Sequence, residues 1–484
     1  MKRIITDYLD ETAKKFPDKV AVTDGRRTLT FDGLRAEARS VASELIRRKI
    51  FHQPIAIRLE QSVGSIICML GVAYSGNFYT IIDDKMPAPR MSKILDTFEP
   101  VLVIDNKNVN ALINSPIDDG LLETTARKIN CMDILYVLFT SGSTGVPKGV
   151  TIGQRSAMEY TEWVSKTFGV DENDVIGNQA PFYFDNSVLD IYQMVSRGAT
   201  LHIIPRAAFM FPARLLEYIS VNRINMVFWV PSILVAIANM GVLDDINVSC
   251  LKKIIFAGEV MPVKQLNQWR RRLPKAVFAN LYGPTEITVD CTYYIVDRDF
   301  ADGDALPIGV PCKDGDVLVL NADDRLVDGS EQGELCVRGS CLSYGYYNNP
   351  EKTIEAFVQN PVSDYPEIIY RTGDLVHYNE RGELMFDGRK DFQIKHMGYR
   401  IELGEIETAA TSLVGIDEAC CLYDKPSEQI VMCYVGLSEP TEIVRRLSTL
   451  LPRYMLPTRF ERLELMPHNA SGKIDRKLLK ERFT

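Results

Sequence analysis

The sequence predicts an α/β protein with more than one domain: a large N-terminal part of β-sheets flanked by helices, which includes a small barrel-like β part, and a small α+β segment at the C-terminal end. Its 484 residues correspond to about three compact units at roughly 150 residues each. Helical and strand-like patterns alternate over the first part of the chain, as they do in layered α/β folds. Beyond residue 295, short strand-like segments follow one another directly, which is typical of an antiparallel sheet or a small barrel.

The composition is that of an ordinary globular protein. Hydrophobic residues make up 46% and charged residues 25%, which excludes a disordered or fibrous chain. Because 64 acidic residues outnumber 55 basic ones, no nucleic-acid partner is expected. No apolar run reaches the roughly 18 residues that a membrane span needs, and the first seven residues lack a signal-peptide core. The ten cysteines form neither a CxxC pair nor a disulfide framework, so we expect a cytoplasmic protein with no membrane association.

The order of elements follows from hydrophobic spacing and turn residues. Helices are expected over residues 7–16 and 31–48, and strands over residues 54–59, 100–104, 200–205, 225–230 and 251–256. The later β segments are expected over residues 317–321, 333–338 and 383–387. The polar stretch at residues 388–391 predicts a division into residues 1–390 and 391–484, the second with helices at 404–413 and 440–450 and a strand at 430–435.

The densest motif is FTSGSTGVPKG at residues 139–149, directly after a strand expected over residues 134–139. Glycines leave backbone N–H groups uncovered, hydroxyl side chains add donors and Lys148 adds a positive charge, a combination suited to an oligophosphate. The usual P-loop pattern is not met, because Pro147 and Gly149 replace the required glycine and hydroxyl residue. A flexible Ser/Gly surface turn is the alternative, and the attached Pro-Lys-Gly favours phosphate binding over it.

Residues 280–288, with the sequence NLYGPTEIT, combine an aromatic ring, a tight Gly-Pro turn, a hydroxyl and a carboxylate. A nucleotide site needs a stacking surface for the base and an oxygen ligand for Mg²⁺. Tyr282 and Glu286 offer these two groups. Taken alone, the segment is equally compatible with an ordinary loop.

Two further turns each present one charged residue. Asp374, in YRTGDL at residues 370–375, follows a tight turn and is suited to accepting hydrogen bonds from both hydroxyls of a ribose. Lys473, in NASGKIDR at residues 469–476, lies at a glycine turn before a basic helix expected over residues 476–482. Taken singly, an ordinary turn and a solvated basic tail explain these two segments better.

In this order and at these separations, the motifs resemble those of the adenylate-forming superfamily, which includes acyl-CoA synthetases, luciferases and the adenylation domains of nonribosomal peptide synthetases. The resemblance also includes GELCVRG at residues 333–339, GRKD at 388–391 and KHMGYR at 395–400, and it extends from Leu29 to Lys473. Unrelated surface turns would not recur in one order, so the interpretation of these motifs as ordinary turns, loops or a basic tail is no longer favoured.

The resemblance implies that the C-terminal segment is a mobile lid domain that rotates about a hinge at Asp391. It implies an ATP site in which Tyr282 stacks on adenine, Asp374 and Arg389 hold the ribose, and Glu286 positions Mg²⁺. The other ATP-binding residues that it implies are Thr140, Ser141, Gly142, Ser143, Thr144, Gly145 and Lys148 around the phosphates, Gly258 and Asn280 at the edge of the adenine, and also Gly283, Thr285 and Lys473.

The catalytic residues implied by the resemblance are Thr140, Lys148, Lys395 and Lys473. In this chemistry a carboxylate attacks the α-phosphorus of ATP, so two anions approach each other and cationic groups lower the barrier. Lys473 would bridge the carboxylate and the α-phosphate region. After pyrophosphate has left, rotation of the lid would withdraw Lys473 and bring in the segment that begins at Lys395, so that a pantetheine thiol can approach.

The segment FDNSVLDIY at residues 184–192 indicates which acid is activated. In family members that activate amino acids, an FDxS segment supplies a carboxylate for the substrate ammonium, and Asp185 matches it. A buried carboxylate is costly unless a cation such as this ammonium pairs with it; an exposed aspartate at a strand end is the alternative. The family's pocket positions, mostly apolar here, match Asp185, Asn186, Leu189, Phe228, Ile255, Ala257, Leu281, Val289 and Asp290.

We therefore expect an enzyme that uses ATP and Mg²⁺ to form an aminoacyl-adenylate and then loads the phosphopantetheine thiol of a separate carrier protein, since no carrier domain follows residue 484. A small to medium amino acid is favoured, and Asp290 hints at a hydroxylated or basic side chain unless it faces away. Length and the pattern at residues 184–192 resemble free-standing D-alanine–carrier protein ligases. The alternatives are an acyl- or aryl-CoA ligase for an acid without an amine, and a non-catalytic nucleotide-binding subunit.

Overall fold

The computed structural model describes residues 4–142, 145–313, 315–469 and 474–484, and it divides into two compact units. The first unit comprises Met1–Asp84, Glu99–Leu138 and Val150–Gly388, and the second comprises Lys85–Phe98, Phe139–Gly149 and Arg389–Thr484. The second unit therefore combines the C-terminal segment with two short pieces of earlier sequence. One of these pieces is the predicted phosphate loop.

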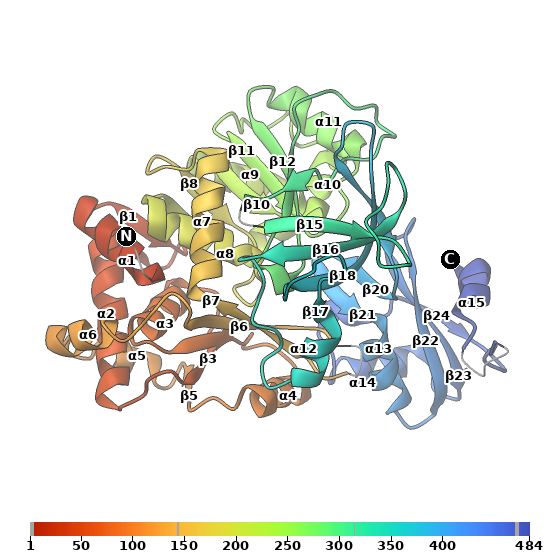
Figure 1. Ribbon diagram of the computed structural model, residues 1–484, viewed down its shortest axis with the longest axis horizontal. Helices are drawn as coiled ribbons and strands as arrows, with labels where there is room; N and C mark the ends of the chain where they lie inside the picture. Colours follow the sequence, from red (N-terminus) through yellow and green to blue (C-terminus); the bar gives the residue numbers. More distant parts are fainter. Residues whose placement is uncertain (1–3, 143–144, 314, 470–473) are drawn as a thin grey trace. The chain divides into compact units, whose positions relative to one another are not determined.

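The first unit contains a nine-stranded sheet whose central strands are parallel and whose edges are antiparallel (Figure 1). Its strands are, in spatial order, β14 (Val310–Pro311), β13 (Thr292–Ile295), β12 (Val277–Tyr282), β11 (Lys253–Ala257), β10 (Met226–Trp229), β8 (Val175–Asn178), β9 (Thr200–Ile203), β1 (Val20–Thr23) and β2 (Thr28–Thr30). The strands expected over residues 200–205, 225–230 and 251–256 are confirmed as β9, β10 and β11, to within two residues at each end.

Parallel neighbours need long crossover connections, and helices provide them. These helices are α8 (Asn186–Arg197) before β9, α9 (Pro212–Val221) before β10, α10 (Pro231–Asn239) before β11 and α11 (Val263–Arg272) before β12. A 3₁₀ turn, η1 (Arg206–Met210), precedes α9. The predicted α/β architecture is therefore confirmed in this part of the chain.

The nine-stranded sheet has a different hydrophobic cluster on each face, because successive strand residues point to opposite sides. Phe228, Ile255 and Leu281 belong to a cluster with residues of α8 and of α7 (Gln154–Phe168). Their chain neighbours Trp229 and Phe256 belong to a second cluster, which includes residues of α9, α10 and α11. Alternation along β10 and β11 thus assigns the predicted pocket residues to the face that α7 and α8 cover.

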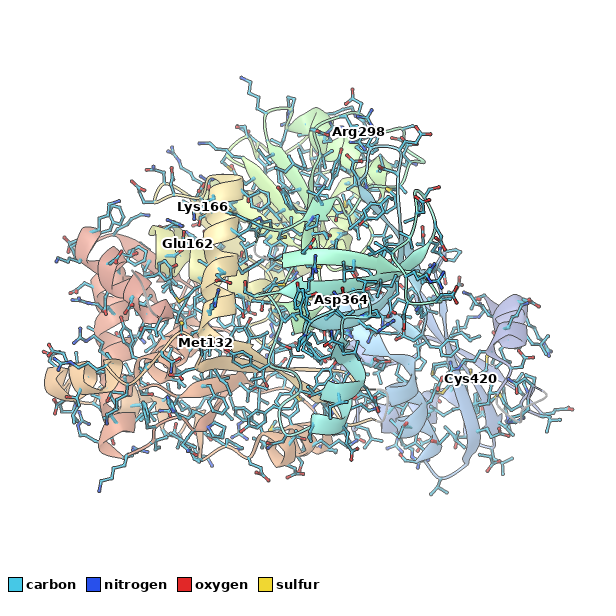
Figure 2. All side chains as sticks on the ribbon, in the orientation of Figure 1. Met132, Glu162, Lys166, Arg298, Asp364 and Cys420 are labelled. Carbon is cyan, nitrogen blue, oxygen red and sulfur yellow. The ribbon has the colours of Figure 1, made fainter. Side chains whose placement is uncertain are left out.

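Polar contacts fix α7 in place. The carboxylate of Glu162 accepts hydrogen bonds from Tyr8 of α1 (Ile5–Lys15) at 2.9 Å and from Arg197 of α8 at 2.6 Å. Lys166 lies one turn further along α7, with its Nζ atom 3.6 Å from Glu162 (Figure 2). Since both neighbouring helices bind the same carboxylate, the face of α7 turned toward the sheet is held at a defined rotation.

A five-stranded sheet lies between α1 and α7 in the chain. Its strands are β5 (Leu102–Asp105), β3 (Pro54–Arg58), β4 (Phe78–Ile81), β6 (Ile134–Thr140) and β7 (Lys148–Gly153). Strand β3 pairs in parallel with β4 and β5, and β4 pairs in parallel with β6. The accompanying helices are α2 (Phe31–Arg47), α3 (Val63–Tyr74), α5 (Val109–Ile113) and α6 (Asp119–Ala126). The Thr30 hydroxyl accepts a 3.2 Å hydrogen bond from the Gly33 amide, which satisfies an unpaired donor and sets the start of α2.

The later β segments of the first unit form one antiparallel sheet, one of the two arrangements that the closely spaced strand pattern predicts. Its strands are β15 (Gly315–Leu320), β16 (Gly333–Gly339), β18 (Ile368–Tyr378) and β17 (Phe357–Gln359), and β19 (Leu384–Arg389) also pairs with β18. The short helix α12 (Pro350–Ala356) leads into β17.

The second unit is an α+β arrangement with its own hydrophobic core. It contains α4 (Ala88–Phe98), a hairpin of β20 (Gln393–His396) and β21 (Tyr399–Glu402), α13 (Leu403–Thr411), a three-stranded sheet of β22 (Ile416–Asp424), β23 (Gln429–Gly436) and β24 (Arg459–Arg462), α14 (Pro440–Leu447), η3 (Arg453–Met455) and α15 (Arg476–Phe483). Helix α14 ends earlier than the predicted residue 450. Ser448 and Thr449 turn their hydroxyls back onto backbone carbonyls at 2.7 Å, which competes with a further helical turn.

Within the described residues, no helix combines the length and apolar character that a membrane crossing requires. All ten cysteines lie in described segments and carry free thiols.

Candidate active site

Four of the predicted pocket residues lie side by side because of strand register. Phe228 of β10 is paired with Ile255 of β11, and Ala257 of β11 is paired with Leu281 of β12. Paired residues and residues two apart share a face of a sheet, so these four side chains line one surface. Leu189 of α8 and Val289 belong to the same buried cluster. An apolar wall of the predicted kind is therefore present on the α8 face of the sheet.

Asp185 lies immediately before α8 and is only 9% exposed. Its backbone carbonyl accepts the Val188 amide at 2.8 Å, and a negative charge near a helix N-terminus is favourable. Asn186, the next predicted pocket residue, begins the helix. Burial, and to a lesser extent the charge of Asp185, raise the pKa of Tyr136 well above its ordinary value. The carboxylate therefore faces the buried interior of the unit, which contradicts the alternative of an exposed strand-end aspartate.

Asp290 is also buried, and Tyr160 of α7 donates a hydrogen bond to its Oδ2 atom at 2.7 Å. The pKa of Tyr160 is raised well above its ordinary value, chiefly by burial and then by the charge of Asp290 and its hydrogen bond. Asp185 contributes to the same upward shift. The carboxylates of Asp185 and Asp290 therefore act on one phenol, so both lie near the same aromatic side chain. Asp290 is therefore held inside the unit beside Tyr160, and its role as a pocket residue stays a prediction.

Two of the predicted nucleoside contacts meet directly. The Tyr282 hydroxyl, at the end of β12, donates to Asp374 of β18, and both side chains are buried. Phe386 of β19 lies against Tyr282 with its ring centroid 6.2 Å away. The Asp374 amide donates to the Thr372 hydroxyl at 3.0 Å. A phenol and a carboxylate from strands far apart in sequence thus form a hydrogen-bonded pair. The aromatic ring of Phe386 beside this pair is suited to packing against a base.

The remaining predicted residues near the base lie around the ends of β11 and β12. Asn280 donates from Nδ2 to the Pro307 carbonyl at 2.8 Å. Gly258 follows β11 with a positive φ of 93°, a conformation that favours glycine. A Cβ atom on Gly283 would lie 2.4 Å from the Val289 carbonyl oxygen, so the turn that leads to Thr285 and Glu286 has no room for a side chain there.

Glu286, the predicted magnesium position, is fully buried in the 3₁₀ turn η2 (Thr285–Ile287). Tyr346 donates to its Oε1 atom at 2.8 Å, and its backbone carbonyl accepts the Ser343 amide at 2.9 Å. A phenol donor fixes the carboxylate without neutralising it, and a carboxylate has about four acceptor positions. Mg²⁺ is commonly held by one or two carboxylates together with substrate phosphates, so Glu286 fits this ion. Elsewhere in the described segments, no group of three His, Cys, Asp or Glu side chains gathers as a metal site.

The predicted phosphate loop is held within the second unit by contacts to α4 and to the C-terminal segment. The Ser141 hydroxyl donates to the Arg400 carbonyl at 2.8 Å and accepts from the Glu402 amide at 3.2 Å. Lys93 of α4 donates to the Gly145 carbonyl at 2.7 Å. Thr140 ends β6 and Lys148 begins β7, and Gly142 accepts the Gly145 amide at 3.0 Å. The Ser141 hydroxyl of the predicted loop is therefore engaged by β21.

A buried ion pair supports the same region. Arg90 of α4 donates to the carboxylate of Glu405 of α13, and the two side chains are 7% and 4% exposed. Arg90 also lies against the Met455 sulfur at 3.9 Å. Helix α13 follows β21 directly, so this pair fixes the helix next to the strand that binds Ser141.

The predicted hinge residue Asp391 receives a two-pronged contact from Arg389, at 2.6 and 2.7 Å. Burial alone would raise the pKa of Asp391, but the hydrogen bonds and charge of Arg389 outweigh it and lower that pKa. Lys395 lies in β20, where it is paired with Arg400. Ser143, Thr144 and Lys473 lie outside the described residues.

Sequence patterns did not single out Tyr136, Tyr160, Tyr346, Arg90 or Glu405. Tyr160 occupies a core-facing position of an amphipathic helix, where an aromatic residue ordinarily indicates packing. Arg90 and Glu405 are 315 residues apart in the chain, so no local motif links them. The signal that could have found Tyr160 is a hydroxyl on an otherwise apolar helix face, because a buried phenol needs a polar partner.

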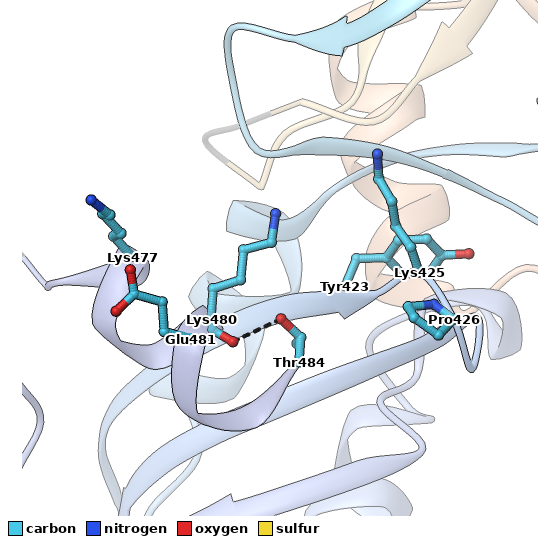
Figure 3. A pocket seen from close by; sticks show the side chains of 7 residues that line it. All are labelled: Tyr423, Lys425, Pro426, Lys477, Lys480, Glu481 and Thr484. Atoms are coloured by element: carbon cyan, nitrogen blue, oxygen red, sulfur yellow. Dashed lines mark hydrogen bonds between the residues drawn. The ribbon is translucent and has the colours of Figure 1, made fainter.

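A separate depression on the second unit involves none of the predicted site residues. It is lined by Tyr423, Lys425, Pro426, Lys477, Lys480, Glu481 and Thr484. Figure 3 shows the ammonium groups of Lys425 and Lys480 pointing in the same direction, and the Thr484 hydroxyl donates to the Lys480 carbonyl at 2.9 Å. This depression is a basic surface feature, and the chemistry-bearing motifs lie on other elements.

Comparison with known proteins identifies the family to which the chain belongs. The family model of AMP-binding enzymes matches residues 9–347. D-alanine–D-alanyl carrier protein ligase from Bacillus licheniformis is 32% identical over 509 residues, which cover 98% of this chain and 99% of that protein. Tyrocidine synthase 1 from Brevibacillus parabrevis is 31% identical over 496 residues, which cover 99% of this chain but 45% of the synthase. The chain thus spans less than half of one relative and nearly all of another.

Among solved structures, the adenylation domain AlmE from Vibrio cholerae, in complex with glycyl-adenosine-5′-phosphate, superimposes with a TM-score of 0.84. The two sequences are 21% identical, and the match covers 100% of this chain and 98% of AlmE. At this identity the likeness establishes the fold, which is that of adenylation domains.

Proposed function

Because the chain belongs to the AMP-binding enzyme family, we propose that it is an AMP-forming ligase that activates an amino acid and transfers it to the thiol of a carrier protein. ATP and the amino acid would give an aminoacyl-adenylate and pyrophosphate. Attack of the carrier's phosphopantetheine sulfur on the acyl carbon would then form the carbon–sulfur bond and release AMP. The catalytic roles below are part of this proposal.

The observation that carries the proposal is the buried carboxylate of Asp185. It is 9% exposed and lies at the start of α8, next to an apolar wall that includes Leu189 and Phe228. A buried charge in such surroundings is stable only with a partner of opposite charge. The ammonium group of an amino acid would be such a partner for the carboxylate, whereas a fatty or aryl acid has no positive charge to offer it.

The nucleoside would lie between the ends of β12 and β18. Asp374, held by the Tyr282 hydroxyl, would accept from the ribose, and the Tyr282 ring would stack on the adenine beside Gly258 and Asn280. Arg389, the other ribose contact, would leave Asp391 when the hinge turns. These roles agree with the burial and mutual contact of Tyr282 and Asp374.

The phosphates would be held by the loop from Thr140 to Lys148. Its backbone N–H groups and Lys148 supply positive potential for the leaving pyrophosphate. When bound, Mg²⁺ would compensate the negative charge of the nucleotide, and Glu286 with Thr285 would hold it. The Tyr346 hydroxyl keeps the Glu286 carboxylate oriented.

Two lysines would serve the two half-reactions. Lys473 would approach the substrate carboxylate and the α-phosphate region during adenylation. Rotation of residues 391–484 about Asp391, relative to residues 1–390, would then bring Lys395 and the following residues toward the adenylate for thiol transfer.

The relatives support a carrier protein as acceptor. The full-length relative from Bacillus licheniformis is named for joining D-alanine to a D-alanyl carrier protein, so we propose a free-standing carrier. The free thiols of all ten cysteines are typical of proteins in the reducing cytoplasm, where we place the enzyme.

The test is amino-acid-dependent exchange of labelled pyrophosphate into ATP, measured with a panel of D- and L-amino acids, fatty acids and aryl acids. We expect exchange with at least one small to medium amino acid and none with acids that lack an amine, and loss of exchange when Mg²⁺ is chelated. Exchange supported only by acids without an amine would overturn the proposal in favour of a CoA ligase. ATP binding without exchange for any acid would indicate a non-catalytic nucleotide-binding protein.

A further inference from the structure

Tyr160 reaches the pocket region from α7, an element that contributes none of the nine predicted pocket positions. Its hydroxyl donates to the Asp290 carboxylate at 2.7 Å, and both side chains are buried. A polar pair of this kind is costly to bury unless both members are engaged. The hydrogen bond between the Tyr160 hydroxyl and the Asp290 carboxylate therefore compensates the cost of burying both groups.

The ring of Tyr160 has little freedom to move. It packs against Trp163 at 5.7 Å between centroids, and Trp163 in turn packs against Tyr293 at 5.3 Å. Two residues after Tyr160, Glu162 anchors α7 to α1 and α8 through hydrogen bonds of 2.9 and 2.6 Å. The position of the Tyr160 hydroxyl is thus set by the packing of three helices.

The backbone of Asp290 is equally constrained. Thr288 and Val289 have positive φ values of 59° and 74°, and the Thr288 hydroxyl is bound to the Cys341 carbonyl at 2.8 Å. A Cβ atom on Gly283 would lie only 2.5 Å from the Cα atom of Asp290. A carboxylate whose backbone and one oxygen are both fixed has a defined orientation.

We infer that Tyr160 is a positioning residue for substrate selection: it orients Asp290 to accept a hydrogen bond from a short amino-acid side chain that ends in a donor, a hydroxyl or an amine. The inference rests on the proposed function and concerns the substrate class of the same site. The predicted pocket positions Phe228, Ile255 and Leu281 are apolar and buried, so we expect them to restrict the length of that side chain, and Asp290 is, besides Asp185, the acidic residue among the predicted positions.

A matched pair of substrates tests this inference. Serine and 2-aminobutyrate have side chains of nearly equal size and differ by a hydroxyl in place of a methyl group. In pyrophosphate exchange with the wild-type enzyme, we expect kcat/KM for serine to exceed that for 2-aminobutyrate, each in the enantiomer that is the better substrate. 2,3-Diaminopropionate extends the comparison to an amine.

Tyr160→Phe removes only the hydroxyl. We expect it to reduce the serine preference about tenfold, as for loss of a hydrogen bond to a charged group, mainly through KM, with KM for ATP and kcat/KM for 2-aminobutyrate little changed. Tyr79→Phe is the matched control, because Tyr79 is a buried phenol of the same cluster whose hydroxyl lies 2.8 Å from that of Tyr192. This control should keep the serine preference.

Equal losses for serine and 2-aminobutyrate in Tyr160→Phe would mean that the hydroxyl is merely structural and would overturn the inference. The inference would also be overturned if the wild-type enzyme activates amino acids but does not prefer serine over 2-aminobutyrate. If Tyr160→Phe does not fold, Asp290→Asn is measured instead and must reduce the same preference. Absence of exchange with every amino acid would refute the proposed function itself, which is a different outcome.

Discussion

The predicted pocket wall of the first unit and the predicted phosphate loop of the second unit are held by different kinds of interaction. Phe228, Ile255 and Leu281 are placed by the register of parallel strands and by burial in a large hydrophobic cluster. Ser141 and Gly145 are placed by single hydrogen bonds to Arg400, Glu402 and Lys93.

Because of this difference, we expect substitutions in the first region to change ligand specificity and substitutions in the second region to change stability. Many apolar contacts share the task of holding the pocket, so removing one polar atom there should change which ligand binds and leave the fold intact. The phosphate-loop region depends on few polar contacts, so removing one buried partner should destabilise the unit. The predictions below test this distinction, beginning with the largest effect.

The largest effect is expected at the buried ion pair of the second unit. Arg90→Met leaves the Glu405 carboxylate, which is 4% exposed, without its guanidinium partner. Breaking a buried pair on one side costs about 3–5 kcal/mol, measured as a loss in the free energy of unfolding in urea. Arg155→Met is the control: its contact to Glu159 joins side chains that are 53% and 29% exposed, and we expect a loss below about 1 kcal/mol. Equal losses would contradict the contrast between the two regions.

A smaller and different effect is expected at the nucleoside contact. Tyr282→Phe keeps the ring and removes the donor to Asp374, so we expect KM for ATP to rise about tenfold, which corresponds to about 1.4 kcal/mol. Steady-state kinetics should show an unchanged KM for the amino acid and a Tm close to that of the wild type. Tyr294→Phe is the control, since that hydroxyl donates to Asp297 at 2.8 Å, away from Asp374. A parallel rise in both KM values would mean that the hydroxyl supports the whole site.

The smallest effect concerns Asp190 in the pocket helix α8. Burial raises the pKa of Asp190 well above its ordinary value, despite a hydrogen bond from Asn178 at 2.8 Å that favours the charged form. Because the folded-state pKa is the higher one, folding favours the protonated acid. Its contribution to stability is therefore complete below the unfolded-state pKa of about 3.9 and is lost as the pH rises through the folded-state pKa.

Asp190→Asn removes this titration. We expect the Tm of the variant minus the Tm of the wild type to increase as the pH is raised from about 4 toward neutrality. Thermal unfolding at several pH values measures this difference. Parallel Tm curves for the two proteins would contradict the prediction that Asp190 is buried in its neutral form.

The sequence predicted those parts of the fold and site that carry a local pattern. Strands β9 to β11 follow from apolar runs, and the segments around Ser141, Tyr282 and Asp374 follow from turn residues joined to groups that bind phosphate or nucleoside. Strand β22 was not predicted, although the apolar residues at 419–423 in its second half are consistent with a buried strand. The contacts of Tyr160 with Asp290 and of Arg90 with Glu405 join residues 130 and 315 positions apart, so only the folded chain reveals them.

The charge of Asp185 offers the most direct test of amino-acid activation. The measurement is a cycle of two proteins, wild type and Asp185→Ala, and two substrates, the best amino acid and its analogue without the amine. We expect Asp185→Ala to lower kcat/KM for the amino acid by about 10²–10³-fold or more, as for one partner removed from a buried charge pair. KM for ATP should hardly change, and the analogue should gain relative to the amino acid. Additive effects, with no coupling between the amine and Asp185, would contradict amino-acid activation and favour a ligase for acids that lack an amine.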